Sequence, residues 1–270
     1  MNFKDKVVVI TGASSGIGLA LAYEFAALGA SIAMGARTEE KLKTVANTLA
    51  ARGTRAIYTA TDVTREEDCK RLIERTVEAF GRIDVLICNA GISMRALFDD
   101  VDLSVLRRLM DVNFWGTVYC TKYALPYIQQ SRGSIVGVSS VAGLHGLPAR
   151  TGYSASKYAM HGFLETIRIE NRKKGVHVMI AAPGFTASNV RFAALTADGS
   201  AQGETPRAEE QMMSPEEVAR RIATGVWKHK RTLLMEFQGR ATFLLKKICP
   251  SFLDKMFYDH MAQEPDSPLR

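Results

Sequence analysis

Short apolar runs alternate with longer amphipathic stretches along the first two thirds of the chain. The runs are rich in β-branched residues and are bounded by Gly, Asp or Asn, which is typical of buried strands. They cover Val7–Ile10, Ser31–Met34, Arg55–Tyr58, Asp84–Cys88, Ser134–Val138 and His177–Ala181. Apolar residues recur at helical spacing over Ile17–Leu28, Glu39–Ala51, Arg65–Phe80 and Leu103–Gln130. This alternation predicts βαβ units, and therefore a parallel sheet with helices on both faces.

The pattern loosens after Gly184. Residues 186–213 combine Gly, Pro and Asp with scattered apolar positions, which predicts a mobile loop with short helical pieces. Ser214, followed by Pro215 and two acids, has the features of a helix start, with Ser as the N-cap and Pro in the first turn. That helix is expected to run to about residue 229, and residues 232–236 resemble a last strand.

No charged or Pro/Ser-rich linker interrupts residues 1–185, and the chain has no internal repeat. We therefore expect one doubly wound α/β domain over residues 1–270. Within it, residues 186–213 are predicted to form the substrate loop. Residues 237–270 are predicted to form a C-terminal helical extension.

Composition narrows the class of protein. Apolar residues make up 47% of the chain and charged residues 23%, which argues against disordered and fibrous proteins. The first residues, MNFKDK, lack the apolar core of a signal peptide, and no apolar run is long enough to span a membrane. The four cysteines lie far apart without a CxxC pair, which argues against a disulfide scaffold or a zinc ribbon. We expect a cytoplasmic protein without a metal site.

The net charge of +7 raises the question of a nucleic-acid partner. The excess is local, because residues 220–255 contain nine basic and two acidic residues and so carry all of it. That segment has no recognisable nucleic-acid-binding module. We therefore expect a small-molecule substrate and no nucleic acid.

The sequence TGASSGIG at residues 11–18 joins the first predicted strand to the first predicted helix. A glycine-rich turn there lets backbone N–H groups and a helix N-terminus approach a pyrophosphate. Its GxxxGxG spacing also occurs in turns without a ligand, but its position in the first βαβ unit favours nucleotide binding. The residues expected to contact the cofactor are Gly12, Ser14, Ser15, Gly16, Ile17 and Gly18.

The end of the second predicted strand bears on the choice of cofactor. An acid about 20 residues beyond the glycines is typical of NAD-binding proteins, because it holds the ribose 2′-hydroxyl. This chain has Ala36 there, followed by Arg37. A guanidinium binds a 2′-phosphate through charge-assisted hydrogen bonds. Arg37 therefore favours NADP(H), and the acids at positions 39 and 40 are interpreted as first-turn residues of the next helix.

Tyr153 and Lys157 are four residues apart, so they lie on one face of a helix, with Ser139 and Ser140 upstream. A free tyrosine has a pKa near 10, and acid–base work at neutral pH needs a value about three units lower. A neighbouring ammonium and an oxidised nicotinamide ring both favour the phenolate. The pair therefore suggests a general acid–base site, although a single YxxxK motif is weak by itself.

With these motifs, the chain resembles the short-chain dehydrogenase/reductase family over residues 5 to about 190. The resemblance rests on TGASSGIG, Asp62-Val63, CNAG at 88–91, Asn113 within DVNFWG, Ser140, YSASK at 153–157 and PG at 183–184. It implies a Rossmann domain whose seven-stranded parallel sheet has the order 3-2-1-4-5-6-7. The long 186–213 loop and the extended tail are similar to the hydroxysteroid-dehydrogenase-like branch.

The resemblance also implies roles. Tyr153 protonates the carbonyl oxygen in reduction or deprotonates the alcohol in reverse, and Lys157 lowers the pKa of Tyr153 and binds the nicotinamide ribose. Ser140 polarises the carbonyl, Asn113 fixes a water in a proton relay behind Lys157, and Ser139 is structural. The cofactor contacts that it adds are Asp62 and Val63 near the adenine, Asn89, Ala90 and Gly91 along the adenosine, and Pro183, Gly184, Thr186 and Ser188 beside the nicotinamide.

Two positions depart from the family pattern. Cys88 stands where many members carry Asn, which is a mild change in a buried strand. Ser188 stands where Thr is common after the PG turn, and its hydroxyl can still reach the cofactor.

These features predict an NADP(H)-dependent oxidoreductase acting on a bulky or lipid-like ketone or secondary alcohol. Two alternatives are a 3-oxoacyl carrier-protein reductase and a non-catalytic NADP(H) sensor or scaffold. The first usually ends soon after the seventh strand, and the second commonly loses the Tyr or the Lys. The resemblance further implies a homodimer or homotetramer formed through the helices near 104–130 and 153–172.

Substrate contacts are less defined by the sequence. Six apolar residues near the motifs are candidates for the substrate cleft, with some expected to be ordinary core: Met94, Leu144, Leu147, Phe185, Val190 and Phe192. His145 lies in the same loop as two of them, and we interpret it as a loop residue without a catalytic role.

Residues 240–258 form two short apolar faces separated by Pro250, flanked by Lys246, Lys247 and Lys255. In one interpretation these faces pack on the domain or on a second subunit. In the other, they form a surface lid that dips into lipid near the substrate mouth, with the lysines against anionic headgroups, and makes a weak peripheral membrane contact.

Overall fold

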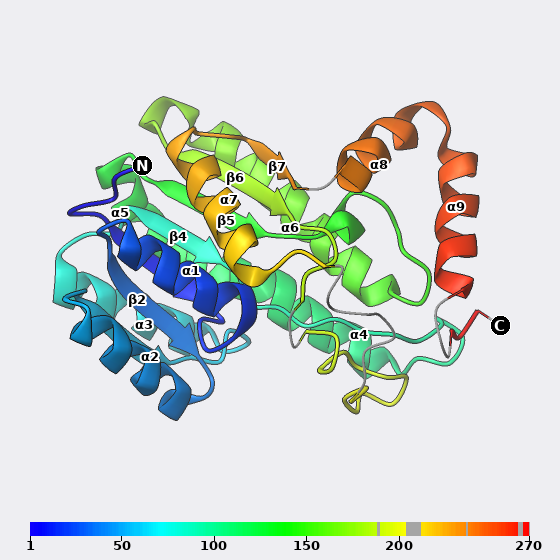
Figure 1. Ribbon diagram of the computed structural model, residues 1–270, viewed down its shortest axis with the longest axis horizontal. Helices are drawn as coiled ribbons and strands as arrows, with labels where there is room; N and C mark the ends of the chain where they lie inside the picture. Colours follow the sequence, from blue (N-terminus) through cyan, green and yellow to red (C-terminus); the bar gives the residue numbers. More distant parts are fainter. Residues whose placement is uncertain (188–189, 204–211, 236, 264–266, 270) are drawn as a thin grey trace.

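A computed structural model of the chain describes residues 1–187, 190–203, 212–235, 237–263 and 267–269. Seven parallel strands form one sheet in the order β3-β2-β1-β4-β5-β6-β7 (Figure 1). The strands are β1 (Val7–Thr11), β2 (Ser31–Ala36), β3 (Ala56–Ala60), β4 (Val85–Cys88), β5 (Ser134–Val138), β6 (His177–Ala182) and β7 (Thr232–Leu234). The predicted fold class and strand order are confirmed.

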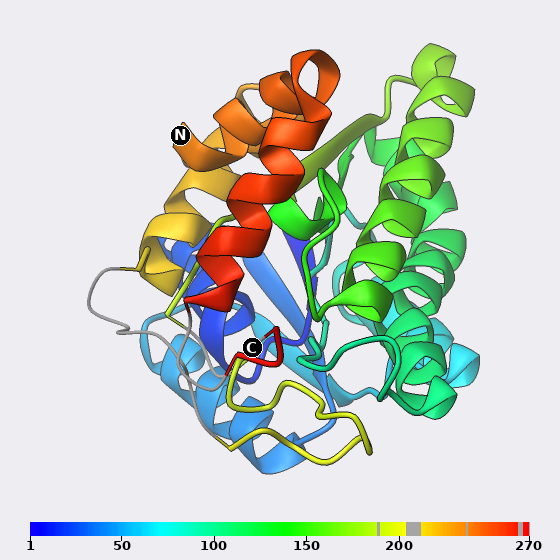
Figure 2. The same cartoon turned by 90° about the vertical axis from the view of Figure 1, so that its right-hand side faces the viewer.

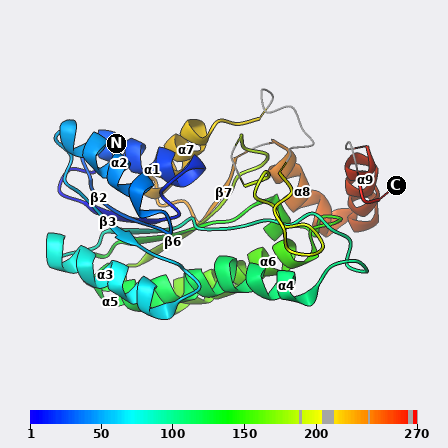
Figure 3. The ribbon, with the colours of Figure 1, turned by 90° about the horizontal axis from the view of Figure 1, so that it is seen from below.

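Helices cover both faces of this sheet. Those of the first two thirds of the chain are α1 (Gly16–Ala27), α2 (Glu39–Ala51), α3 (Glu66–Phe80), α4 (Leu103–Met110), α5 (Gly116–Ser131) and α6 (Thr151–Glu170), followed later by α7 (Pro215–Trp227), α8 (Phe237–Ile248) and α9 (Pro250–Ala262). Figure 3 shows α1, α2 and α7 on one face and α3, α4, α5 and α6 on the other, with α8 and α9 at the end of the molecule beyond β7. None of the helices in the described residues is long and apolar enough to cross a membrane.

The apolar strands follow from this layering. Val8 and Ile10 of β1 pack in the core beneath α1, α2 and α7, whereas Val9 between them packs in the opposite core beneath α3, α5 and α6. Because both faces of β1 are covered, all of its residues are buried. A strand buried on both faces is apolar along its whole length, which is why the sequence shows runs rather than alternation.

The predicted helix over Leu103–Gln130 is wrong in one respect. The segment is helical, but a π-helical turn, η1 (Asp111–Trp115), separates α4 from α5. The turn contains Asn113, whose fully buried side chain hydrogen-bonds Ile92 and Ser156. Such turns are frequent at functional sites. A π-helical turn adds one residue to a single turn, which barely changes the spacing of apolar residues. The sequence pattern therefore did not indicate the break between α4 and α5.

Strand order places a crevice at the centre of the sheet. From β1 the chain moves to β2 and β3 on one side, and then returns to β4 on the other side of β1. In open parallel sheets, ligands bind where the order reverses, beyond the carboxyl ends of the strands. The loops that follow β1, β4 and β5 at this edge contain Gly12, Asn89 and Ser140.

In the last third of the chain, α7 and β7 agree with the pattern, but the described residues of 186–213 contain turns and isolated bridges and not the expected short helical pieces. Ser214 is the N-cap of α7, and its hydroxyl accepts a hydrogen bond of 3.1 Å from the backbone N–H of Glu217. Two further helices, α8 and α9, follow β7. Their short connection contains Cys249, and Pro250 occupies the first turn of α9. Figure 2 shows α9 beside the end of α6 that carries the 144–150 loop.

Candidate functional site

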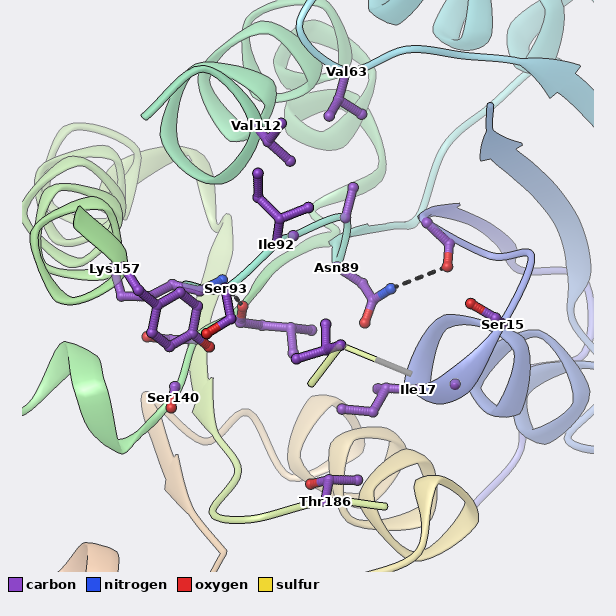
Figure 4. A pocket seen from close by; sticks show the side chains of 18 of the residues that line it. Ser15, Ile17, Val63, Asn89, Ile92, Ser93, Val112, Ser140, Lys157 and Thr186 are labelled. Carbon is purple, nitrogen blue, oxygen red and sulfur yellow. Dashed lines mark hydrogen bonds between the residues drawn. The ribbon is translucent and has the colours of Figure 1, made fainter. Parts of the chain in front are cut away.

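A cleft with a volume of about 570 Å³ opens at the carboxyl edge of the sheet, within the range of small-molecule sites. Figure 4 shows Ser15, Ile17 and Asn89 on one side of it and Ser140, Lys157 and Ser93 on the other. The expected residues that line it are Gly12, Ser14, Ser15, Gly16, Ile17, Arg37, Asp62, Val63, Asn89, Ala90, Gly91, Ser140, Tyr153, Lys157, Pro183, Gly184 and Thr186. Gly18 and Asn113 are not among its lining residues, and Ser188 lies outside the described residues.

The glycine-rich turn is built for close approach. Gly12 and Gly16 have φ of +67° and +52°, a region that favours glycine. A Cβ atom at position 12 would lie 2.9 Å from the Cα of Ala90, closer than packed atoms approach. The Thr11 hydroxyl accepts hydrogen bonds of 3.0 Å from the backbone N–H groups of Asn89 and Ala90. The ends of β1 and β4 are thereby tied together, and the N-terminus of α1 faces the cleft.

Gly18 lies behind this turn rather than in the cleft. A Cβ atom there would lie 2.2 Å from the carbonyl oxygen of Gly12 and 2.6 Å from Nδ2 of Asn89. That amide donates a hydrogen bond of 2.9 Å to the carbonyl oxygen of Thr11. Gly18 therefore lets α1 pack against the turn, and we withdraw the expectation of a direct cofactor contact at this residue.

Arg37 and Asp62 line the far end of the cleft. Arg37 follows β2 directly and is exposed, while Glu39 and Glu40 stand in the first turn of α2 outside the lining. The Asp62 carboxylate accepts hydrogen bonds from the backbone N–H and the hydroxyl of Thr64, at 3.0 and 2.8 Å. The described residues therefore offer a guanidinium at the end of β2 and a carboxylate at the end of β3.

Tyr153, Ser140 and Lys157 converge at the other end. Burial raises the pKa of the half-buried Tyr153, while a hydrogen bond with the Ser140 hydroxyl and the charge of Arg150 lower it. The ammonium of Lys157 lies 5.7 Å from the centre of the Tyr153 ring and donates a hydrogen bond of 2.9 Å to the carbonyl oxygen of Val138. Burial lowers the pKa of Lys157 to about 8.

Asn113 supports the site from beneath the cleft. Its Oδ1 accepts from the backbone N–H of Ile92 at 2.9 Å, and its Nδ2 donates to the carbonyl oxygen of Ile92 at 3.0 Å and to the hydroxyl of Ser156 at 2.9 Å. The side chain therefore holds the segment after β4 against α6. The expected role in a water relay stays a prediction, and this clamp is an additional role that the sequence did not indicate.

Ser139 lines the cleft beside Ser140, and its hydroxyl pairs with His161. Its hydroxyl lies 2.6 Å from Nε2 of His161. Burial, followed by the charge of Lys157, lowers the pKa of His161 to about 4, so the ring is neutral near pH 7. A Cβ atom on Gly143 would lie 2.6 Å from the Ser139 hydroxyl, so the turn after Ser140 fits closely over this pair.

The predicted apolar cleft is correct for only part of its members. Leu147, Phe185 and Val190 line the cleft. Met94 is fully buried in a small core with Leu195, and Leu144, although buried, is not a lining residue. Phe192 is exposed outside it. Apolar spacing near a motif does not distinguish a cleft wall from the core behind it.

His145 makes contacts with the C-terminal helices. Its Nε2 lies 3.2 Å from a carboxylate oxygen of Asp254, and its ring stacks on Phe257 with centroids 5.1 Å apart. Lys246 donates to the carbonyl oxygen of Leu144 at 2.9 Å. The loop that follows Ser140 is therefore fastened to α8 and α9, and His145 is not among the residues that line the cleft.

Among the polar lining residues that the sequence analysis missed are Ser93, Arg108, Arg150 and Arg191. Arg150 and Arg191 are buried, which is unusual for arginine. Arg150 stands three residues before Tyr153, and this spacing was a signal in the sequence that could have identified it. Arg108 stands on α4, whereas the positions of Ser93 and Arg191 in the cleft depend on loop packing.

The cleft fits a dinucleotide. Its two ends provide different chemistry, with glycines and a helix N-terminus at one end and the Tyr153, Ser140 and Lys157 groups at the other. Because Gly12 has no side chain, the turn lies directly against Ala90 at the end of β4. A nicotinamide dinucleotide would be held by the glycine-rich turn, Arg37 and Asp62, with the nicotinamide end beside Pro183, Gly184 and Thr186.

Comparisons with known proteins agree with this arrangement. The sequence profile of the short chain dehydrogenase family matches residues 6–197. An 11-beta-hydroxysteroid dehydrogenase A from Arachis hypogaea is 40% identical, over 99% of this chain and 78% of that protein. An 11-beta-hydroxysteroid dehydrogenase 1A from Arabidopsis thaliana is 37% identical, over 94% of this chain and 74% of that protein.

Two solved structures are similar in fold and differ in cofactor. A short chain dehydrogenase/reductase from Burkholderia phymatum in complex with NAD has a TM-score of 0.83 at 25% identity and covers 94% of this chain and 96% of its own. An alcohol dehydrogenase from the archaeon Thermococcus sibiricus complexed with 5-hydroxy-NADP has a TM-score of 0.73 at 25% identity and covers 84% of this chain and 93% of its own.

Proposed function

The chain belongs to the short-chain dehydrogenase/reductase family, in its hydroxysteroid-dehydrogenase-like branch, and from this premise we propose that it transfers a hydride between NADP(H) and a bulky ketone or secondary alcohol. The observation that carries the proposal is the convergence of Tyr153, Ser140 and Lys157 at one end of a cleft whose other end is the glycine-rich turn. An acid–base group and a nucleotide site in one cleft are what carbonyl reduction requires.

In this mechanism, side chains of the protein transfer the proton to or from the substrate oxygen. The cofactor supplies the hydride when it is bound. The hydroxyl of Tyr153 donates its proton to the carbonyl oxygen in reduction, and its phenolate takes the alcohol proton in oxidation. Ser140 donates a hydrogen bond to the same oxygen and polarises the carbonyl, and the Lys157 ammonium favours the phenolate. Asn113 keeps the segment after β4 against α6, which fixes the floor of the site.

Arg37 supports NADP(H) as the preferred cofactor. It lines the cleft at the carboxyl end of β2, where an NAD-dependent protein usually carries an acid. Glu39 and Glu40 do not line the cleft. A guanidinium there would bind a 2′-phosphate by charge-assisted hydrogen bonds.

A bulky, lipid-like substrate is supported by the cleft and by the relatives. Leu147, Phe185 and Val190 give the substrate end apolar walls. The similar plant proteins are named hydroxysteroid dehydrogenases. The alternative of a 3-oxoacyl carrier-protein reductase is disfavoured by α8 and α9 after β7. A non-catalytic sensor is disfavoured because Asn113, Ser140, Tyr153 and Lys157 are all present.

The direct test is oxidation of NADPH against a panel of ketones that spans steroids, retinoids, quinones and acyl thioesters. We expect turnover with at least one bulky alicyclic ketone, faster with NADPH than with NADH, and little with acyl carrier-protein thioesters. Preference for the thioesters would support the carrier-protein reductase instead. Tight NADPH binding with no turnover on any ketone class would support the sensor.

A second copy of the chain is the proposed partner for α5 and α6, giving a homodimer or homotetramer. Trp115 is 43% exposed beside α5, and Ile169 is 72% exposed near the end of α6. Both side chains would be covered if these helices packed against a second subunit. Light scattering on the purified protein gives the mass of the assembly.

A cytoplasmic location belongs to the same proposal. Cys69, Cys88 and Cys120 are buried free thiols, and Cys249 is an exposed free thiol. Free thiols are usual in reducing compartments. Fractionation of the cell of origin, with antibodies against the chain, tests the location.

Weak contact with anionic membranes is proposed for α8 and α9. Leu244, Ile248 and Phe252 are exposed, and Lys247 is exposed beside them. Leu253 and Met261 are buried, so part of the segment packs on the protein. Each basic residue near an anionic surface contributes about 1 kcal/mol, which predicts adhesion that salt abolishes.

We therefore expect the full-length protein to float with vesicles that contain anionic lipid at low salt, and to stay at the bottom with neutral vesicles. The double substitution Ile248→Asp/Phe252→Asp should abolish flotation. Leu103→Asp, which changes an exposed leucine at the start of α4, is the matched control and should float like the wild type. Absence of flotation by folded wild-type protein at low salt would leave only packing or subunit contact for this surface.

A further inference from the structure

Arg150 is a buried cation beside the proposed acid–base group. It is the N-cap residue of α6 and is 7% exposed. Its carbonyl oxygen accepts the hydrogen bond of 2.8 Å from Ser154 that closes the first turn of the helix. Residues three apart on a helix lie on neighbouring positions of one face, and Arg150 and Tyr153 line the same cleft.

The guanidinium is anchored across the cleft. Its Nη1 donates hydrogen bonds of 2.7 Å to the carbonyl oxygen of Met94 and 3.2 Å to the hydroxyl of Ser93. Both acceptors belong to the segment that follows β4, residues 92–95, which we call the strap. These contacts fix the position of the positive charge, because a buried arginine bonded to a backbone carbonyl has little freedom to rotate away.

The strap is a junction between three parts of the site. Asn113 holds its first residue, Ile92, through two hydrogen bonds. Two backbone hydrogen bonds join the strap to Leu195. The N–H of Leu195 donates to the carbonyl oxygen of Ser93 at 2.9 Å, and the N–H of Arg95 donates to the carbonyl oxygen of Leu195 at 2.8 Å. Arg150 adds the link to the start of α6. The residue thus connects the helix that carries Tyr153 to the floor of the cleft and to the loop around residue 195.

A link of this kind does not itself require a charge. A neutral amide donor would also bond a backbone carbonyl, and burial of a cation costs free energy. Lys157, another of the cations that line the cleft, directs its ammonium at the carbonyl oxygen of Val138 and lies 5.7 Å from the centre of the Tyr153 ring. Arg150, at the N-cap of α6, and Lys157, one turn after Tyr153, therefore both line the cleft together with Tyr153.

We propose that Arg150 is a positioning residue that also stabilises the phenolate of Tyr153 through its charge, so that two cations, not Lys157 alone, prepare this group for proton transfer. The inference rests on the proposed function for its catalytic meaning, but the effect on Tyr153 is a property of the protein alone. The charge of Arg150 lowers the pKa of Tyr153, against the burial that raises it. An opposite charge nearby shifts a pKa by about one to three units.

The test is a titration of Tyr153 without cofactor or substrate. The protein is labelled at the Cζ atoms of tyrosine, and the Tyr153 resonance is assigned as the one missing from Tyr153→Phe. Arg150→Gln keeps a hydrogen-bond donor toward Met94 but removes the charge. We expect the pKa of Tyr153 to rise by about one unit, a tenfold loss of phenolate at a given pH below the pKa. Arg150→Lys, which keeps the cation, should stay closer to the wild type.

Two further variants separate charge from structure. Ser93→Ala removes one hydrogen bond of Arg150 and leaves its charge, so the Tyr153 titration should change little. Arg172→Met removes an exposed charge at the opposite end of α6 and should also leave it unchanged. An unshifted Tyr153 in folded Arg150→Gln overturns the proposal. If Arg150→Gln does not fold, the same titration is made on Arg150→Met. A raised Tyr153 pKa in Arg150→Met, with a smaller shift in Arg150→Lys, supports the proposal, and an unshifted pKa in Arg150→Met overturns it.

Kinetic measurements distinguish failure of this proposal from failure of the proposed function. If alcohol oxidation is found, its kcat/KM requires the phenolate and rises with pH, and in Arg150→Gln this rise should move to higher pH by the same amount as the titration. If no substrate is found, the proposed function fails while the titration still decides the role of Arg150. A lower kcat/KM with an unmoved pH profile would mean a purely structural role and would overturn the electrostatic part.

Discussion

Tyr153→Phe is expected to lower turnover at least about a hundredfold, the usual lower bound for loss of a general acid, while NADPH binding changes only a few fold. The substitution keeps the ring, which lies half-buried in the cleft, and removes only the hydroxyl that hydrogen-bonds Ser140. Because the Tyr153 hydroxyl transfers its proton in the transition state, removal of this hydroxyl lowers kcat and kcat/KM and does not lower cofactor affinity.

Turnover is measured with the best ketone from the panel, and NADPH affinity by fluorescence titration of the same preparations. Tyr158→Phe is the matched control, since Tyr158 lies on the same helix, is exposed and donates its hydroxyl to the carbonyl oxygen of Leu144 outside the cleft. It should keep turnover near the wild-type value. Retained turnover in Tyr153→Phe would assign proton transfer to another group.

Arg37→Ala is expected to weaken NADPH binding about ten- to a hundredfold and to leave NADH binding nearly unchanged. Removal of a hydrogen bond to a charged group costs about 1.5–3 kcal/mol, and about 1.4 kcal/mol corresponds to a factor of ten in affinity. The 2′-phosphate is the only chemical difference between the two cofactors, so a contact with it affects one and spares the other.

Dissociation constants for both cofactors, measured by titration calorimetry on wild type and variant, check this expectation. Lys41→Ala is the control, because Lys41 is an exposed basic residue in α2 that does not line the cleft. Lys41→Ala tests whether the loss of any nearby positive charge weakens NADPH binding as much as Arg37→Ala does. A wild-type preference for NADH, or an equal loss of both cofactors in Arg37→Ala, contradicts the assignment of Arg37.

Local rules were sufficient for the scaffold and for much of the site. The strands follow from apolar runs such as Val7–Ile10, because a central strand covered on both faces is apolar along most of its length. The glycine-rich turn follows from the glycines of TGASSGIG between the first strand and the first helix, and the positive φ values of Gly12 and Gly16 agree with it. Tyr153 and Lys157 are related by helical spacing alone. Each of these inferences needs only neighbours along the chain.

The tertiary structure decided which residues meet across distant segments. It moved Gly18 behind the turn, placed Met94 in the core and Leu147 in the cleft, and inserted the π-helical turn that brings Asn113 to Ile92. It also brought the 144–150 loop against α9 through His145 and Asp254, which no spacing along the chain could indicate.

Arg150 is the clearest example of the difference between what the sequence determined and what the tertiary structure determined. Its position three residues before Tyr153 was readable in the sequence, but its partners Met94 and Ser93 lie more than fifty residues away along the chain. The sequence by itself determined the type and order of the elements, because propensity and hydrophobic period are local. Only the folded chain determined the direction and burial of each polar side chain, because these depend on close packing between segments that the local pattern does not relate.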